Sequence, residues 1–100
     1  MGTYRVWVIG GWCGNRMFMV AEHLAQKLAD AGFPCSMRTF NAWENYTQPP
    51  AADLILQLLP AFSEAETGCP VLNIKPLLAD LDDSNTMRRV LEQVRAAYPV

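Results

Sequence analysis

Histidine is nearly absent from this chain, since His23 is the only one among its 100 residues. A single histidine excludes a histidine-rich metal site, and no nucleophile-elbow motif marks a hydrolase triad. His23 lies among polar residues, so we expect it on a solvated helix face. Asp80, Asp82 and Asp83 cluster before the last predicted helix, where we expect them to cap the helix and to favour its dipole. We therefore predict neither a metal nor a cofactor.

An excess of basic charge and a long apolar run are also missing. The net charge is −2, which argues against a surface for nucleic acid or anionic membranes. The longest apolar stretch is far shorter than the roughly 18 residues that span a bilayer. The first residues, MGTYRV, have no signal-peptide layout and do not fit a myristoylation motif. We expect a cytoplasmic protein with no direct membrane insertion.

Cysteine is sparse as well, with Cys13, Cys35 and Cys69 in the whole chain. The number is odd and no CxxC spacing occurs, so free thiols in a reducing compartment are the simplest interpretation. Apolar residues make up 51% of the chain. This content predicts that residues 1–100 form a single folded domain with one core.

The hydrophobic pattern alternates short apolar runs with segments of helical periodicity. We predict strands at 4–9, 34–40, 54–59 and 69–74, helices at 17–31 and 77–81, and a last helix after Ser84. Residues 41–52 are expected to be irregular, and residues 61–68 to form a polar connection with a glycine stop. No hairpin signal joins any two strands. The pattern favours an α/β fold, a four-stranded parallel sheet flanked by helices in a Rossmann-like three-layer arrangement.

The segment from Val6 to Met19 reads VWVIGGWCGNRMFM, which predicts a strand, a glycine turn and a helix N-terminus. Backbone N–H groups at such a turn converge on one point, where the helix dipole adds partial positive charge. We expect the glycines to allow the backbone angles that point these amides inward. The candidate phosphate-binding residues are Gly10, Gly11, Trp12, Gly14, Asn15 and Arg16.

Cys13 is the candidate nucleophile of this turn. A helix N-terminus and a nearby cation such as Arg16 lower the pKa of a thiol, and the thiolate is the reactive form. A phosphoryl group could rest on the Cys13 sulfur while Arg16 binds two of its oxygens. The alternative is a tight turn with a buried cysteine. GxGxxG, P-loop and Cys-x5-Arg spacings are all absent, because Arg16 follows Cys13 by only three residues.

Several segments together resemble the enzyme IIB components of the sugar phosphotransferase system, of the galactitol type with a lactose/cellobiose-like fold. Gly10 to Gly32 matches the family spacing from its cysteine to the glycine that ends its first helix, and Ala21-Glu22 falls on an Ala-Glu of that helix. The family's Ala-Asp-Leu-Ile strand is matched by residues 52–55, and residues 69–80 follow the outline of a later segment, Ile-Pro-Val-Ile-x-Gly-x-Pro-Phe-Leu-x-Gly.

The resemblance implies a phosphocarrier function in sugar transport. The loop cysteine would accept a phosphoryl group from a histidine of a IIA partner and pass it to a sugar at a IIC membrane partner. In the ungapped alignment the nucleophile position falls on Gly10, and Cys13 replaces a family glycine. The family's hydroxyl residues in this loop correspond to Arg16, Met17 and Phe18 in this chain. The alternative is therefore a non-catalytic IIB-like binding or regulatory module that has lost the nucleophilic cysteine.

Overall fold

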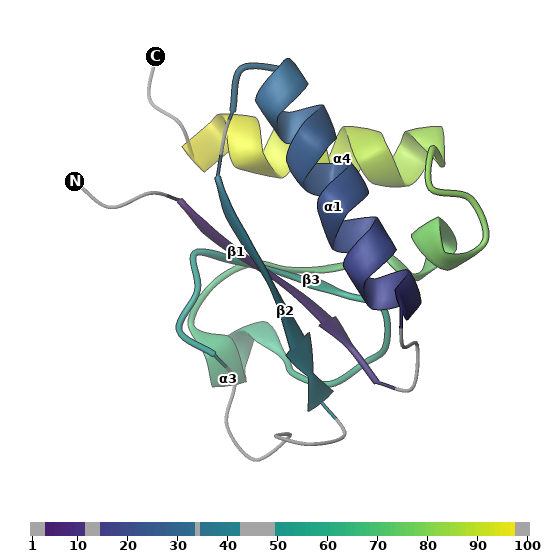
Figure 1. The fold of residues 1–100 in the computed structure, drawn as a ribbon. Helices are drawn as coiled ribbons and strands as arrows, with labels where there is room; N and C mark the ends of the chain where they lie inside the picture. The colour runs from purple at the N-terminus through teal and green to yellow at the C-terminus, as the bar shows by residue number, and fades with distance from the viewer. Residues whose placement is uncertain (1–3, 12–14, 34, 43–49, 98–100) are drawn as a thin grey trace.

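The computed structural model describes residues 4–11, 15–33, 35–42 and 50–97. Four strands and three α-helices account for most of this part of the chain, with one turn of 3-10 helix (Figure 1). In chain order the elements are β1 (Arg5–Gly10), α1 (Asn15–Asp30), β2 (Ser36–Asn41), β3 (Leu54–Gln57), α3 (Glu64–Thr67), β4 (Val71–Asn73), η1 (Lys75–Leu78) and α4 (Ser84–Ala97).

The strands form one parallel sheet in the order β2-β1-β3-β4, which confirms the predicted four-stranded parallel sheet. β1 is central, and its Val6 lies beside Met37 of β2 and Leu54 of β3. Parallel neighbours bury both faces of a strand, so the continuous apolar run Val6–Ile9 suits this place. All four strands end at the same edge of the sheet.

Helices cover the sheet on both sides, as the three-layer prediction requires. α1 and α4 lie together over one face, and α3 lies toward the other (Figure 1). On the first face Val6, Val8, Leu54 and Leu56 pack in one core with the apolar sides of α1 and α4. On the second face a smaller core joins Ile9, Ala42, Ile55 and Phe62. No described helix combines the length and the apolar content needed to cross a membrane.

α1 ends at Asp30, one residue before the predicted end, and Gly32 follows it in a left-handed conformation. Gly32 has a φ of +90° and donates to the carbonyl of Ala29 at 3.0 Å. Phe33 donates to the carbonyl of Leu28 at 2.8 Å, and its ring packs against the larger core. These two bonds form a Schellman motif, which satisfies carbonyls that the helix leaves without partners.

Replacing Gly32 by alanine isolates the cost of this backbone conformation. An added Cβ meets nothing within 4 Å, so steric contact contributes no cost. We expect Gly32→Ala to lower the free energy of unfolding by about 1–2 kcal/mol, because left-handed φ values are unfavourable for alanine. Urea denaturation measures the loss. Gly32→Asn should lose less, since asparagine tolerates this region, and equal losses in both variants would contradict the explanation.

Two connecting segments differ from their predictions. Residues 61–68, predicted to be a polar connection with a glycine stop, contain the one-turn helix α3. Its capping box pairs Ser63 with Glu66, and Gly68 ends it with a φ of 70°. The predicted helix at 77–81 is the 3-10 turn Lys75–Leu78 instead, because Pro76 starts the turn earlier. A capping box in the first segment and a proline in the second therefore decide the structure over lengths too short to show a helical period.

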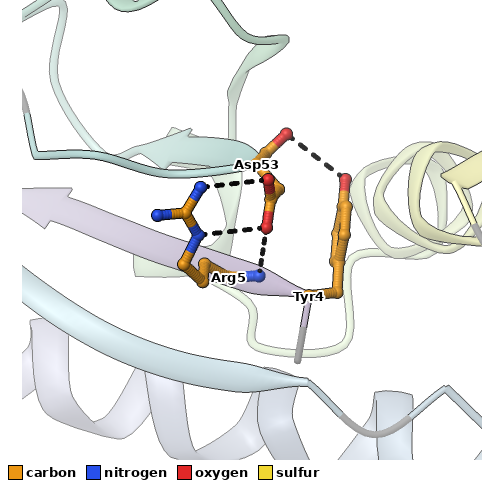
Figure 2. A network of polar contacts seen from close by, with 3 residues as sticks. All are labelled: Tyr4, Arg5 and Asp53. Atoms are coloured by element: carbon orange, nitrogen blue, oxygen red, sulfur yellow. Dashed lines mark hydrogen bonds and ion pairs between the residues drawn. The ribbon is translucent and has the colours of Figure 1, made fainter. Parts of the chain in front are cut away.

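An ion pair ties β1 to β3 at the amino edge of the sheet (Figure 2). The Asp53 carboxylate accepts from Arg5 Nε at 3.2 Å, from Arg5 Nη2 at 3.3 Å and from the Arg5 backbone N–H at 2.8 Å. The hydrogen bonds from Arg5 lower the pKa of Asp53, and the same contact raises the pKa of Arg5. Tyr4 Oη donates to the Asp53 carbonyl at 3.5 Å. The pair lies at the opposite end of β1 from the glycine turn and holds β1 and β3 in register.

Candidate functional site

The glycine turn begins at the carboxyl edge of the sheet, at its topological switch point. β1 lies between β2 and β3: the chain runs from β1 outward to β2, then crosses back past β1 to β3 and continues outward on that side to β4. In open parallel sheets, ligands bind outside the carboxyl ends of strands at this kind of position. Gly10 is the last residue of β1, and both Gly10 and Gly11 are buried. Of the six predicted phosphate-binding residues, these two start the turn.

Met17 occupies the space that a side chain at position 10 would need. A Cβ built on Gly10 would lie 2.9 Å from Met17 Sδ and 3.3 Å from Met17 Cγ. Met17 itself is buried at 4% exposure in the core under α1. The φ of Gly10 is not left-handed, so the predicted use of conformational freedom is wrong at this glycine. Close approach of α1 to the end of β1 is the physical reason for glycine here.

The N-terminus of α1 follows the turn and starts at Asn15, two residues before the predicted start. Its first turn contains no acidic residue, so no carboxylate competes for its free N–H groups. Arg16 is exposed, and its Nη1 donates to the carbonyl of Leu78 at 2.6 Å. The guanidinium therefore binds the end of η1. The sequence had instead predicted that it binds phosphate oxygens at the glycine turn.

The predicted nucleophile Cys13 lies outside the described residues, together with Trp12 and Gly14. The other two cysteines are free thiols, and each is half-buried. Burial raises the pKa of the Cys35 thiol above its ordinary value, which keeps it protonated and weakly reactive at neutral pH. Neither Cys35, which precedes β2, nor Cys69, which precedes β4, lies at the carboxyl edge. Cys13 remains the candidate for a thiol at this edge.

Amide side chains end three of the four strands, a feature that the sequence interpretation missed. Asn41, Gln57 and Asn73 are the last residues of β2, β3 and β4. Gln57 is 8% exposed, and its Oε1 accepts from the backbone N–H of Ala61 at 3.3 Å and of Phe62 at 3.0 Å. Asn73 Oδ1 accepts from the Lys75 N–H at 2.9 Å. The amides of Gln57 and Asn73 therefore build turns, and the recurrence of amides at strand ends was the available signal.

A hollow of about 380 Å³ lies between α1 and the segment around η1. Its apolar walls come from Met19 and Val20 on one side and from Leu77, Leu78 and Leu81 on the other, with Arg16 and Asp80 also lining it. Met19 is 54% exposed. The hollow adjoins the first turn of α1, so a molecule bound at the glycine turn would lie near it.

The aspartates before α4 are held in structural contacts. Asp83 Oδ2 accepts from the Thr86 hydroxyl at 2.7 Å and from the Thr86 N–H at 3.1 Å, which caps α4, and these two hydrogen bonds lower the pKa of Asp83. Asp80 Oδ1 accepts from the Asp82 N–H at 3.0 Å. Asp82 Oδ1 lies 2.8 Å from His23 Nε2. The His23 side chain is 25% exposed, so the expected solvated face is wrong, and the capping role is confirmed for Asp83.

Comparison with known proteins adds no assignment to this geometry. No protein-family model matches the chain, and no curated protein and no solved structure matches it. What stands is therefore the architecture itself: an α/β domain with a glycine turn between its central strand and the N-terminus of a 16-residue helix.

Proposed function

We propose that this chain is a phosphocarrier domain of a sugar phosphotransferase system, resembling the galactitol-type IIB components. One observation carries the proposal: the glycine turn joins the central strand β1 to the N-terminus of α1 at the switch point of a parallel sheet. The free N–H groups and the dipole that a helix N-terminus generally offers would favour a phosphate dianion at that point. The spacing of the turn within the chain is that of the IIB family.

The proposed chemistry is a transfer of one phosphoryl group in two steps. The Cys13 thiolate attacks the phosphorus of a phosphohistidine on a IIA partner, so an S–P bond forms and the N–P bond breaks. The imidazole then takes up a proton. In the second step a sugar hydroxyl at a IIC membrane partner attacks the phosphorus, its proton is released, and the thiolate leaves. In this proposal the domain works in the cytoplasm, with neither metal nor cofactor.

A second function has an observation in its favour. The position of the family nucleophile in the ungapped alignment is Gly10, and the Met17 side chain fills the space that a side chain there would need. Arg16 is bound to the Leu78 carbonyl. Both facts favour a IIB-like module that binds IIA or IIC partners without carrying phosphate. The two functions differ in whether a covalent phosphocysteine forms.

Intact-mass spectrometry separates the two functions. The chain is incubated with phosphoenolpyruvate, the general phosphotransfer proteins and a panel of IIA proteins. We expect one phosphate adduct in the wild type and in Cys35→Ser, and none in Cys13→Ser. The Cys35→Ser variant is the matched control, because it removes a thiol away from the glycine turn.

Two other results would redirect the proposal. An adduct that persists in Cys13→Ser would place the phosphate on another residue and sink the role of Cys13. The absence of any adduct, with IIA proteins that still bind the chain in a pull-down, would establish the non-catalytic module. Absence of both adduct and binding would remove the chain from this transport system.

A further inference from the structure

The segment between β4 and α4 is anchored to the core at few points. Residues 75–82, which we call the strap, comprise η1 and the turn that follows it, and they lead past α1 to the start of α4 (Figure 1). Leu77 is the one buried side chain of the strap, at 1% exposure, whereas α1 buries five side chains in the same core. Segments with few buried apolar contacts open at a lower free energy than the core itself.

The backbone of the strap is hydrogen-bonded within the strap. The N–H groups of Ala79 and Asp80 both donate to the Pro76 carbonyl, at 3.2 and 3.1 Å. The Asp82 N–H donates to Asp80 Oδ1 at 3.0 Å. These bonds connect residues of the strap to one another and not to the sheet or to α1. The strap can therefore leave α1 as one body while these bonds stay intact.

Polar side chains of α1 contact the strap at two points. Arg16 Nη1 donates to the Leu78 carbonyl at 2.6 Å. Further along the helix, His23 Nε2 and Lys27 Nζ lie 2.8 and 3.8 Å from Asp82 Oδ1. Residues spaced by seven and by four positions share one face of a helix, so this face of α1 holds the strap. The Asp82 carboxylate is exposed, and contacts between exposed charges are weak enough to break readily.

The hollow of about 380 Å³ separates part of the strap from α1. Met19 and Val20 line it from α1, and Leu78 and Leu81 line it from the strap. In a close-packed interior, side chains would fill such a space. The strap and α1 therefore share less contact than two fully packed elements do, and less contact is lost when the strap moves away.

We propose that the strap is a hinged element that opens as one body and is held closed by its two polar contacts with α1. Ile74, which is fully buried, and Asp83, which caps α4, stay in place at its two ends. Opening frees the Arg16 guanidinium for another acceptor and widens the hollow beside the first turn of α1. This conformational device does not depend on the phosphocarrier function.

Thiol labelling measures the opening of the strap. Leu77→Cys places a thiol at the buried position of the strap, and Leu24→Cys places one at a buried position of α1. Iodoacetamide modifies each thiol when its surroundings open, and peptide mapping by mass spectrometry separates it from the native thiols. We expect position 77 to be labelled at least about tenfold faster than position 24, because opening of the strap exposes position 77 without global unfolding.

Removal of either contact with α1 should favour the open strap. Added to Leu77→Cys, Arg16→Met should speed labelling at position 77 about three- to tenfold, because it removes a hydrogen bond to the strap. Asp82→Ala should speed it about two- to fivefold, since exposed ion pairs are weak. The two factors should multiply in the combined variant, because both contacts hold one body. The matched controls Arg38→Met and Asp30→Ala change exposed residues of β2 and of the far end of α1, and should leave this labelling unchanged.

Two results would overturn the proposal. Equal labelling rates at positions 77 and 24 would mean that the strap opens only when the whole domain unfolds. A change at Asp82 that leaves labelling at position 77 unaltered would mean that the two ends of the strap move separately. Should Leu77→Cys lose its far-ultraviolet circular dichroism signal, Val20→Cys replaces it, because Val20 is 1% exposed and lines the hollow from α1.

Discussion

Gln57→Met is expected to lower the free energy of unfolding by about 2–4 kcal/mol, although the new side chain has nearly the same length and is more apolar. The amide oxygen of Gln57 accepts two backbone N–H bonds, from Ala61 and Phe62, at the turn that leaves β3. Methionine offers no comparable acceptor, so both N–H groups lose their partner. An unsatisfied buried donor costs about 1–3 kcal/mol, and here there are two.

Urea denaturation of the wild type and the variant measures this loss. Gln26→Met is the matched control, because Gln26 is exposed on α1 and its amide only donates to Asp30 at 2.9 Å. That change should stay within about 0.5 kcal/mol of the wild type. A loss below about 1 kcal/mol for Gln57→Met would mean that water reaches the turn and replaces the amide oxygen.

Gly10→Cys, which places a thiol where the proposed IIB resemblance puts the nucleophile, is expected to destabilise the fold by about 1–3 kcal/mol through overpacking. The new Cβ would lie 2.9 Å from Met17 Sδ, so the thioether must move. Met17→Ala alone should cost about 2–5 kcal/mol, since it opens a cavity in the core. The double variant should lose about 0.5–3 kcal/mol less stability than the sum of the two single losses, because the thiol enters the space that Met17 vacates.

The control for this double-mutant cycle of Gly10→Cys and Met17→Ala is a second large-to-small change on the same helix. Leu28 is 1% exposed and lies near the far end of α1. Gly10→Cys and Leu28→Ala should therefore add within about 0.5 kcal/mol. Full additivity of Gly10→Cys with Met17→Ala would show that Met17 is not what excludes a side chain from position 10. The same variants, tested for a phosphate adduct, reveal whether relief of this contact creates an acceptor.

The architecture could be predicted from the sequence because its signals are long and mutually consistent. Val6–Ile9 is apolar without interruption, as a central parallel strand requires, and the periodicity of α1 runs over four turns to a glycine in the left-handed region. Shorter elements were harder to predict. α3 depends on one capping box, and η1 depends on the position of Pro76, so neither has enough residues to show a period.

The candidate site was only partly predictable because its contacts come from distant parts of the chain. Arg16 and Leu78 are 62 positions apart in the sequence, and no local pattern in α1 indicates that a carbonyl of η1 accepts the guanidinium. The packing of Met17 against Gly10 is local in sequence, yet it depends on the angle at which α1 leaves the turn. His23 was misplaced for the same reason, since its partner Asp82 comes from the segment before α4.

The central place of β1 has a consequence for how the chain folds. β1 precedes both of its neighbours in the sequence, and β3 begins at Leu54, more than forty residues after the end of β1 at Gly10. During synthesis β1 therefore emerges before both of its partners, and its second edge stays unpaired until β3 has also left the ribosome. Pairing between distant strands is slow, and an unpaired apolar strand is prone to aggregation. α1, which follows at once and packs on β1, is the earliest local element that can shield one face of it.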